Sequence, residues 1–286
     1  MGAQSATMSL FLLLATIAIG ACTVAPRTPE TAQPHPVFPP PPEEPRFIYE
    51  RSLYSSADML QDSDTDTFRR FVTGEKRAGE AFAKPYGVAV HQGRVYVSDT
   101  VRRVVMMFDV PGKRFAQIGG DDPGSLRLPL GLDVDGAGNL YVCDGTTKYV
   151  QVYDSSGKYL RQFAGPEWLH RPTGLAVTRT GDRVYVVDTG GVGIQDHRVR
   201  VFDAATGKHL LDFGARGDGP GEFNLPRDIA IAPDGTLFVV DGGNFRVQVF
   251  DKNGKYLRTF GSVGRQGGQF SRPKEIAIDR AGNVYV

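Results

Sequence analysis

Short runs of alternating apolar and polar residues fill most of this chain, and they recur as a repeat. One copy reads Pro–x–Gly, an apolar alternation, Gly–x–Val–Tyr–Val–x–Asp, then Phe–Asp and Gly–Lys, with small variations. The prolines that open the copies recur every 43 to 54 residues, at Pro85, Pro129, Pro172, Pro226 and Pro273. The aspartates that close the second apolar run are Asp99, Asp144, Asp188 and Asp241. A repeat of this length is typical of the blades of a β-propeller.

Each copy is predicted to form four antiparallel strands. In the fourth copy these cover residues 228–231, 237–240, 246–250 and 256–260. The turn Pro233-Asp234-Gly235 joins the first two, and its residues are those that tight turns favour. The sequence therefore predicts an all-β protein, a propeller of four-stranded blades.

The number of blades follows from the copies. A fifth copy begins at Pro273 and reaches Val286, two residues short of the expected Asp. We expect residues 47–54 and 68–72 to supply strands of one more blade, because propellers often close by sharing a blade between both chain ends. These expectations give six blades in the complete protein, about four and a half of them in this chain, which then lacks C-terminal residues.

The fourth copy resembles the NHL repeat family. The resemblance rests on residues 221–231, on Phe238-Val239-Val240-Asp241 and on residues 244–250, and it extends over 71–286. It implies the propeller fold but no single function, since NHL propellers include protein-binding, RNA-binding and enzymatic members. The whole layout also resembles bacterial six-bladed propeller lipoproteins with a proline-rich neck.

Residues 1–22 are predicted to be a lipoprotein signal peptide. The apolar run Leu10–Ile19 is too short for a stable membrane span. The following Ile19-Gly20-Ala21-Cys22 resembles a bacterial lipobox, which implies lipidation of Cys22, although no Lys or Arg precedes the run. An ordinary secretory signal is the alternative. With Thr23 next in the chain, the resemblance implies the outer membrane of the bacterial cell envelope.

Residues 23–46 are predicted to be a proline-rich linker, ahead of a propeller domain over 47–286. Nine prolines lie between positions 26 and 45. Such a segment favours a stiff, extended conformation that would hold the domain away from the membrane. Recognition of a PxxP motif by a partner is the alternative.

Charge gives no indication of a nucleic-acid partner. The 33 Lys and Arg residues nearly cancel the 32 Asp and Glu residues. No basic cluster of the kind that contacts phosphates is visible, and export would separate the protein from RNA. We therefore expect no nucleic acid among the partners.

The repeated residues are weak candidates for a functional site. Because one aspartate closes the second strand of every copy, we expect these four side chains to accept hydrogen bonds from backbone donors; a ring that binds a cation is the alternative. Cys143 lies inside a predicted strand without a nearby base, which favours a buried, inert thiol.

Residues that break the repeat are better candidates. The connector 165–171 contains the sole tryptophan, and the third copy is five residues longer than the others before its third strand. Trp168 is expected either to anchor a partner or to fill the gap between two blades. The candidate face comprises Trp168, His170, Arg171, Asp196, His197, Arg216 and Arg227.

These features favour a membrane-tethered, non-enzymatic scaffold that binds a protein or another envelope partner through its loop face. No nucleophile and base are paired in the sequence, and no cofactor is expected. The alternative is a metal-dependent propeller enzyme, a lyase or lactonase, with Zn or Ca in the central channel. His170 and His197 are weak candidate ligands for that metal.

Overall fold

The computed structural model describes residues 35–59, 64–74, 79–191 and 196–286, and the chain divides into two units, Met1–Ser52 and Leu53–Val286. In the first unit, β1 (Val37–Phe38) pairs with β2 (Phe47–Ile48) in an antiparallel ladder. The predicted signal peptide, Cys22 and the first part of the linker lie outside the described residues. No helix among the described residues is long and apolar enough to cross a membrane.

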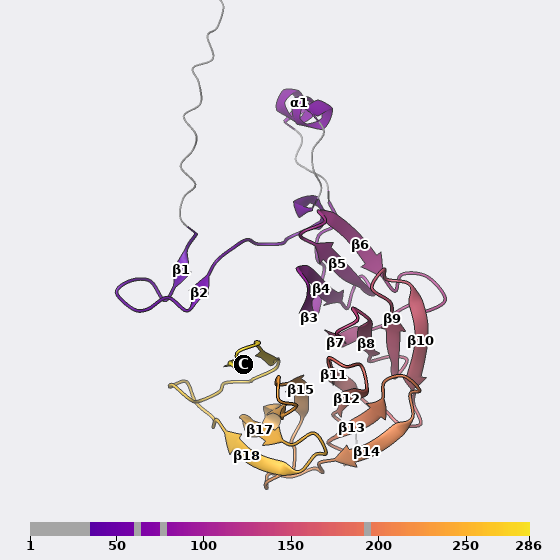
Figure 1. The fold of residues 1–286 in the computed structure, drawn as a ribbon, viewed down its shortest axis with the longest axis vertical. Coiled ribbons are helices and arrows are strands. Elements are labelled where there is room, and N and C mark those ends of the chain that lie inside the picture. Colours follow the sequence, from indigo (N-terminus) through magenta and orange to yellow (C-terminus); the bar gives the residue numbers. More distant parts are fainter. Residues whose placement is uncertain (1–34, 60–63, 75–78, 192–195) are drawn as a thin grey trace, which may run out of the picture. The chain divides into compact units, whose positions relative to one another are not determined.

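The second unit contains four four-stranded antiparallel sheets, the blades of a β-propeller (Figure 1). Blade 1 consists of β3 (Pro85–His91), β4 (Arg94–Asp99), β5 (Val104–Asp109) and β6 (Arg114–Ile118). Blade 2 consists of β7 (Pro129–Val134), β8 (Leu140–Asp144), β9 (Tyr149–Tyr153) and β10 (Tyr159–Ala164). Blade 3 consists of β11 (Pro172–Val177), β12 (Arg183–Asp188), β13 (Arg198–Asp203) and β14 (His209–Phe213).

Blade 4 follows the predicted boundaries closely. It consists of β15 (Pro226–Ile231), β16 (Leu237–Asp241), β17 (Arg246–Phe250) and β18 (Tyr256–Phe260), with the 3-10 turn η2 (Gly242–Asn244) before β17. A fifth hairpin pairs β19 (Ala277–Ile278) with β20 (Val284–Tyr285). The all-β propeller prediction is confirmed.

One predicted strand is wrong. Residues 68–72 lie in the helix α1 (Asp64–Thr73), which follows the 3-10 turn η1 (Ser56–Asp58). Phe68, Phe71 and Val72 have the spacing of one helical face, which explains why a short apolar run here is helical. Within residues 47–54, β2 is the one strand, and it pairs with β1 and not with a blade.

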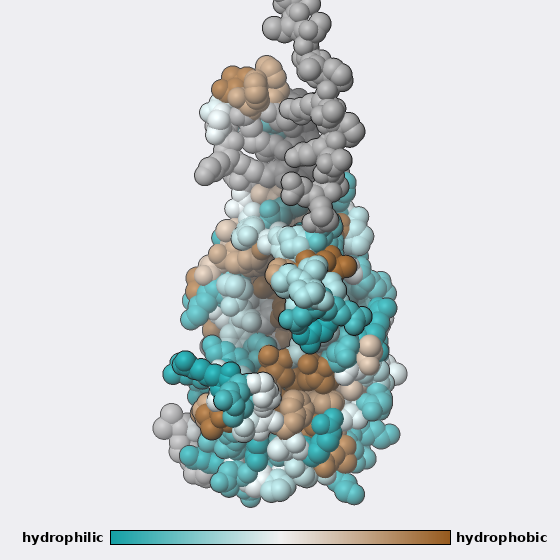
Figure 2. Space-filling view, turned by 90° about the vertical axis from the view of Figure 1, so that its left-hand side faces the viewer, coloured by the Kyte–Doolittle hydropathy of each residue, from teal (hydrophilic) through white to brown (hydrophobic). Residues whose placement is uncertain are grey.

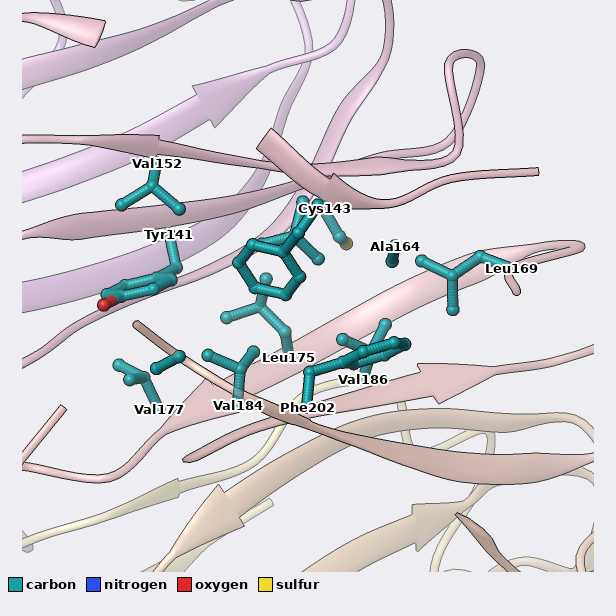
Figure 3. Close-up of a cluster of buried hydrophobic side chains, with 13 residues drawn as sticks. Tyr141, Cys143, Val152, Ala164, Leu169, Leu175, Val177, Val184, Val186 and Phe202 are labelled. Carbon is teal, nitrogen blue, oxygen red and sulfur yellow. The ribbon is translucent and has the colours of Figure 1, made fainter. Parts of the chain in front are cut away.

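Alternating side chains on each blade fill the space between neighbouring blades. The cluster between blades 2 and 3 joins Tyr141 and Cys143 of β8 with Val186 and Phe202 of blade 3 (Figure 3). Phe202 is completely buried. Because every blade contributes one face to each of two clusters, the blades stabilise each other through apolar burial.

In each of the four blades, the pairing between the first and second strands shifts in register just after the opening proline. In blade 2 the β7–β8 pairing moves from Pro129 directly to Leu132, which leaves Leu130 out of the ladder. The Ser98 hydroxyl of blade 1 donates to the Leu130 carbonyl at 2.8 Å. In blade 4 the Thr173 hydroxyl of blade 3 donates to the unpaired Arg227 carbonyl, also at 2.8 Å. A hydroxyl from one blade thus satisfies a carbonyl that the bulge of the next blade releases.

Candidate functional site

The strand-closing aspartates are structural hydrogen-bond acceptors, as predicted. All four are completely buried. Asp144 accepts the N–H groups of Arg127 and Leu128, in the connector that enters its blade, and those of Thr146 and Thr147, in its own turn, at 2.6–3.0 Å. Asp99 accepts four backbone N–H groups in the same way. A carboxylate with this many donors closes each blade against its connector.

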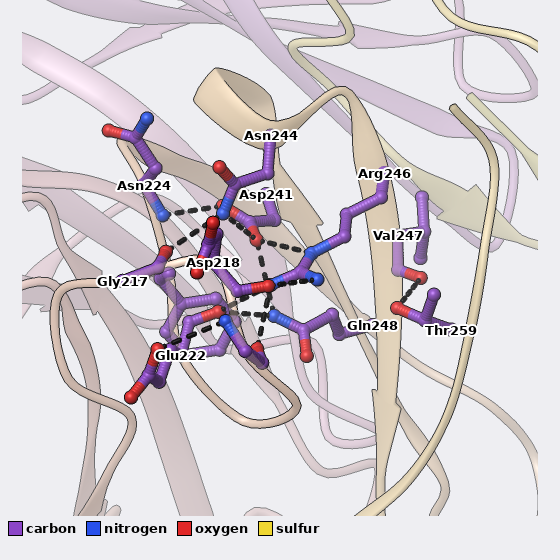
Figure 4. A network of polar contacts seen from close by, with 12 residues as sticks. Gly217, Asp218, Glu222, Asn224, Asp241, Asn244, Arg246, Val247, Gln248 and Thr259 are labelled. Carbon is purple, nitrogen blue, oxygen red and sulfur yellow. Dashed lines mark hydrogen bonds and ion pairs between the residues drawn. The ribbon is translucent and has the colours of Figure 1, made fainter. Parts of the chain in front are cut away.

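Asp241 has a more elaborate network than the other three (Figure 4). It accepts hydrogen bonds from the Asn224 backbone N–H and from the side chains of Asn244, Arg246 and Gln248. The Arg246 guanidinium also donates to the carbonyls of Asp218, Gly219 and Glu222 at 2.7–2.9 Å. These contacts fix the glycine-rich connector before blade 4, so the network is part of the scaffold.

Trp168 lies on blade 3 and keeps part of its ring exposed. Its indole stacks on His209 with the ring centroids 4.3 Å apart and the planes 16° apart. Its edge meets Phe202, and the Arg200 guanidinium lies 6.0 Å from its centroid. The tryptophan is 37% exposed. One side of the ring therefore packs on blade 3 and the ring is partly exposed, while the role of Trp168 as a partner anchor stays a prediction.

An ion-pair network lies beside the tryptophan. Arg200 is buried, and its guanidinium lies 2.7 Å from Asp212 and 3.7 Å from Asp188. Arg198 pairs with Asp196 and with Asp212. The network explains why the strand β13 alternates arginine with valine: the arginines face the carboxylates, and the valines Val199 and Val201 enter the core.

The remaining residues of the predicted face lie in three places: near Trp168, against or in the connector before blade 4, and on the inner strand β15. His170 approaches Asp196 at 3.7 Å, and the Arg171 backbone N–H is bound by Asp188. His197 is buried, where its Nδ1 lies 3.2 Å from the Phe223 carbonyl and 3.2 Å from the Leu225 N–H.

Arg216 forms an isolated parallel bridge with Phe223 in the connector before blade 4, and Arg227 is on the inner strand β15. Residues 192–195 of the predicted insertion lie outside the described residues.

Among the residues that the structure describes, no three His, Cys, Asp or Glu side chains form a group that could hold a metal ion. His197 uses its Nδ1 in backbone hydrogen bonding, and His170 lies beside Asp196 and Trp168 on the connector. This donor set does not fit a metal centre. The assignment of His170 and His197 as metal ligands stays a prediction.

The inner strands line a channel of about 1050 Å³ in the second unit. β3, β7, β11, β15 and β19 all contribute to its wall. Val88, Val90 and Ile231 supply apolar surface, and polar or charged side chains that include Asp133, Arg179 and Asp279 also line the wall. Figure 2, which views the molecule from the open side of the arc of blades in Figure 1, shows hydrophobic surface among hydrophilic surface. A concave site that combines apolar surface with polar groups can hold a small ligand.

Two carboxyl groups meet in this channel, Asp228 of β15 and Glu275 just before β19. Asp228 is 7% exposed, accepts the Ile276 N–H at 3.0 Å and shares a side-chain hydrogen bond with Glu275. Burial raises the pKa of Asp228 well above its ordinary value, and the charge of Glu275 acts in the same direction. Burial also raises the pKa of Glu275, which the hydrogen bond from Asp228 opposes. The pKa of Asp228 is therefore the more strongly raised of the two.

Two further titratable groups face the same channel. Burial raises the pKa of Tyr86 in β3 to about 12, with further contributions from the charges of Glu275 and Asp228. Burial raises the pKa of Asp133 in β7 to about 6, although the carboxylate accepts the Val177 N–H at 2.9 Å. The channel thus contains a phenol and three carboxyl groups whose pKa values are all raised by burial.

The carboxyl pair was missed in the sequence, but a signal for it exists. Two residues after the opening proline, the first three copies have Gly87, Gly131 and Gly174, whereas the last two have Asp228 and Glu275. Comparing the copies column by column reveals this change. Cys143, by contrast, is buried as predicted, and burial raises the pKa of its thiol.

Comparison with known proteins agrees with this architecture. Residues 223–250 match the NHL repeat. This match covers the end of the connector before blade 4 and the first three strands of that blade. The NHL-like repeat of this chain is also similar to the human NHL repeat-containing protein 3, with 35% identity over 88 residues, 31% of this chain and 24% of that protein.

Several of the similar proteins are enzymes by name. A probable peptidyl-alpha-hydroxyglycine alpha-amidating lyase of Caenorhabditis elegans is 34% identical over 91 residues, 30% of this chain and 24% of the lyase. The chain thus spans about a quarter of the length of the curated relatives that it matches. A gluconolactonase from Xanthomonas campestris is similar in structure, with a TM-score of 0.54, 21% identity, and coverage of 69% of this chain and 66% of that one. At that identity the similarity concerns the propeller fold alone.

Proposed function

We propose that this NHL-like propeller is a scaffold that binds a protein partner through a connector face, defined by Trp168, His170, Arg171 and Asp196. The observation that carries the proposal is the partly exposed Trp168 ring, held by stacking on His209 and by its edge contact with Phe202. A fixed aromatic ring loses little conformational entropy on binding, and Trp and Arg are enriched among residues that dominate interface energies. Arg171 is exposed on the same connector.

A photo-crosslinking amino acid placed at Arg171 tests this function in intact cells. We expect one discrete crosslinked product, which disappears when Trp168→Ala is added while the thermal melting of the propeller stays unchanged. The matched control carries the crosslinker at Leu257, which is exposed on the outer strand of blade 4. Equal products at both positions, or a product that survives Trp168→Ala, would show that the connector face is not the binding surface.

The location of the scaffold is part of the proposal. We infer that lipidation of Cys22 tethers it to the bacterial outer membrane, with the proline-rich segment 23–46 as the spacer. The support is the sequence Ile19-Gly20-Ala21-Cys22 after an apolar run. Labelling with an alkyne fatty acid should mark the chain but not the Cys22→Ser variant. A label on both would place the modification elsewhere.

A second function is favoured by the Asp228–Glu275 pair. We propose acid–base chemistry on a small molecule in the channel, with Asp228 as the proton donor and Glu275 as the base. Two carboxyl groups whose environments separate their pKa values are a common arrangement for such chemistry. The metal-dependent form of this alternative lacks a fitting set of ligands among the described residues, so no step is assigned to a metal.

The names of the relatives suggest the substrates to test. We would measure turnover of sugar lactones and of peptides ending in α-hydroxyglycine, using the full chain, Asp228→Asn and Glu275→Gln. Turnover that falls by two orders of magnitude or more in both variants supports the proposal. Turnover that is equal in all three proteins, or absent from all three while both substrate classes bind, would rule out this pair as the catalytic groups.

A further inference from the structure

The partly exposed indole of Trp168 is held by a side chain that can change its charge. The His209 ring stacks on the indole, with the ring centroids 4.3 Å apart and the planes 16° apart. Its Nε2 lies 2.7 Å from a carboxylate oxygen of Asp212, in the same strand β14. A carboxylate only accepts hydrogen bonds, so Nε2 donates, and a second proton would bind at Nδ1. One imidazole thus connects the aromatic ring of the connector face to a carboxylate.

The ion-pair network beside His209 has an excess of negative charge. Its members are the carboxylates of Asp188, Asp196 and Asp212 and the guanidinium groups of Arg198 and Arg200. Three carboxylates face two guanidinium groups, so one positive charge on His209 would balance the network. An imidazolium at this position would have an ion-pair partner, Asp212, already in contact.

The remaining charged and titratable groups around His209 come from the connector, from the outer strand of blade 2 and from the turn before β14. They are Glu167, His170 and Arg171, then Arg161, then Asp203 and Lys208. His170 lies 3.7 Å from Asp196, and the Arg161 guanidinium donates to the Ala204 carbonyl. Asp203 accepts N–H groups of its own turn, and the other three are exposed to solvent. Among the described residues, Asp212 is the ion-pair partner of His209.

A proton on His209 would strengthen the contact that holds Trp168. A cation beside the face of an indole is attracted by the π electrons, and an imidazolium would also form an ion pair with Asp212. A neutral imidazole provides neither interaction. Both interactions hold the indole against blade 3, so less conformational entropy remains for a partner to remove on binding.

We propose that protonation of His209 makes the connector face bind its partner more tightly at acidic pH. Histidine is the side chain that ordinarily changes charge between about pH 5 and about pH 8. The change in the stack is a property of this chain alone. The effect on binding rests on the proposed function, in which Trp168 anchors a protein partner.

The fluorescence of Trp168 tests the stack without any partner. Trp168 is the sole tryptophan, so its emission reports this ring alone when tyrosine is not excited. Contact with an imidazolium quenches indole emission, whereas contact with a neutral imidazole quenches it far less. We expect the emission of the full chain in mild detergent to fall as the pH is lowered from about 8 to about 5.

The variants at His209 separate this group from the other histidines. The fall in emission should disappear in His209→Gln, which keeps an N–H donor for Asp212 and stays neutral. It should also disappear in His209→Phe, which keeps an aromatic ring in the stack, and circular dichroism would check the folding of both variants. The control His170→Gln, on the same face, should keep the fall.

Crosslinking from position 171 tests the effect on binding. Membranes from cells that carry the photo-crosslinking residue there are brought to about pH 5.5 or about pH 8 before irradiation. We expect severalfold more product at the lower pH, and equal product at both pH values when His209→Gln is added.

The two measurements fail in different ways. Emission that does not change with pH, or that falls equally in His209→Gln, would overturn the inference even where a crosslinked product forms. A normal change in emission with equal product at both pH values would overturn the link between the stack and binding. Product absent at both pH values, while the emission still responds to pH and to His209→Gln, would contradict the proposed partner.

Discussion

At the scale of single residues, the carboxylates of this propeller fall into two groups with opposite behaviour. The strand-closing aspartates are surrounded by N–H donors, whereas Asp228 lies in a channel with two backbone donors and the carboxyl group of Glu275 as a neighbour. Donors favour the charged form of a buried carboxyl group, and burial without them favours the neutral form. The same residue type is therefore a charged structural acceptor in one place and a carboxyl group with a raised pKa in another.

Asp144→Asn tests the structural group. The amide keeps the size of the side chain but replaces one acceptor oxygen with a donor, which faces backbone N–H groups. We expect the free energy of unfolding to fall by about 2–4 kcal/mol, as for other losses of buried hydrogen-bond networks. The measurement is urea unfolding, with Asp154→Asn in an exposed turn as the control, expected to cost less than about 1 kcal/mol. Similar costs for both variants would contradict this role.

Asp228→Asn tests the second group through the pH dependence of stability. Because the folded-state pKa of Asp228 is raised, the native state binds its proton more tightly than the unfolded chain does. Its stabilising contribution is then complete below the unfolded pKa, about 4, and is lost as pH rises through the folded-state value. We expect the melting temperature of the variant to decline less between pH 4 and pH 8 than that of the unchanged chain.

Asp234→Asn is the control for this pH experiment. Backbone and side-chain hydrogen bonds with Thr236 lower the pKa of Asp234, so its contribution has the opposite sign. That variant should lose stability mainly at pH values above the unfolded pKa. Its melting temperature should decline between pH 4 and pH 8 at least as much as that of the unchanged chain. Parallel pH profiles for Asp228→Asn and the unchanged chain would show that this carboxyl group does not hold a shared proton.

At the scale of elements, the inner strands come so close that side chains are excluded at one position. A methyl group at Gly174 would lie 2.4 Å from the Asp228 carboxylate and 2.8 Å from the Arg227 carbonyl. The glycine in blade 3 therefore provides the space in which the carboxyl group of blade 4 sits. A small residue is needed at this position because the neighbouring blade approaches it closely, and not because of the conformation of its own strand.

Gly174→Ala should consequently destabilise the propeller by about 1–3 kcal/mol, the usual cost of overpacking. The change should also shift the pH profile assigned to Asp228, because the added methyl group displaces that carboxyl group. Gly267→Ala is a suitable control, since nothing lies within 4 Å of its added methyl group. An unfolding midpoint equal to that of the control would show that the inner strands move apart at no cost.

The sequence predicted elements better than it predicted the pairing of distant residues. The strands β17 and β18 have the predicted boundaries because turn residues and alternation within one copy define them locally. Helix α1 was missed because its short run of Phe68, Phe71 and Val72 suits either structure. The Asp228–Glu275 pair was missed because its members belong to different copies, and only the packing of blades brings them together.

At the scale of the whole molecule, stability rests on contacts between blades, as in other repeat proteins. Each blade has two apolar faces, and a neighbouring blade buries each face that it covers. Clusters of this kind couple neighbouring blades, so a cavity in one cluster weakens the sheets on both sides.

Phe202→Ala tests this coupling. The ring is completely buried and contacts Phe163 of blade 2 as well as Trp168 and His209. We expect a loss of about 3–5 kcal/mol in the free energy of unfolding. Hydrogen exchange should accelerate in both β9 and β13, which belong to different blades. Acceleration confined to blade 3 would mean that the blades unfold independently. Leu210→Ala, at a half-exposed position of β14, serves as the control.

The hydroxyl contacts across the register shifts bear on how such a chain can change over evolutionary time. The donors Ser98 and Thr173 are side chains, but the acceptors at Leu130 and Arg227 are main-chain carbonyls. An acceptor of this kind persists whatever residue mutation places there, which is consistent with leucine in one blade and arginine in another. A newly duplicated blade would meet its neighbour's hydroxyl at once, while its own channel-facing residues remained free to diverge.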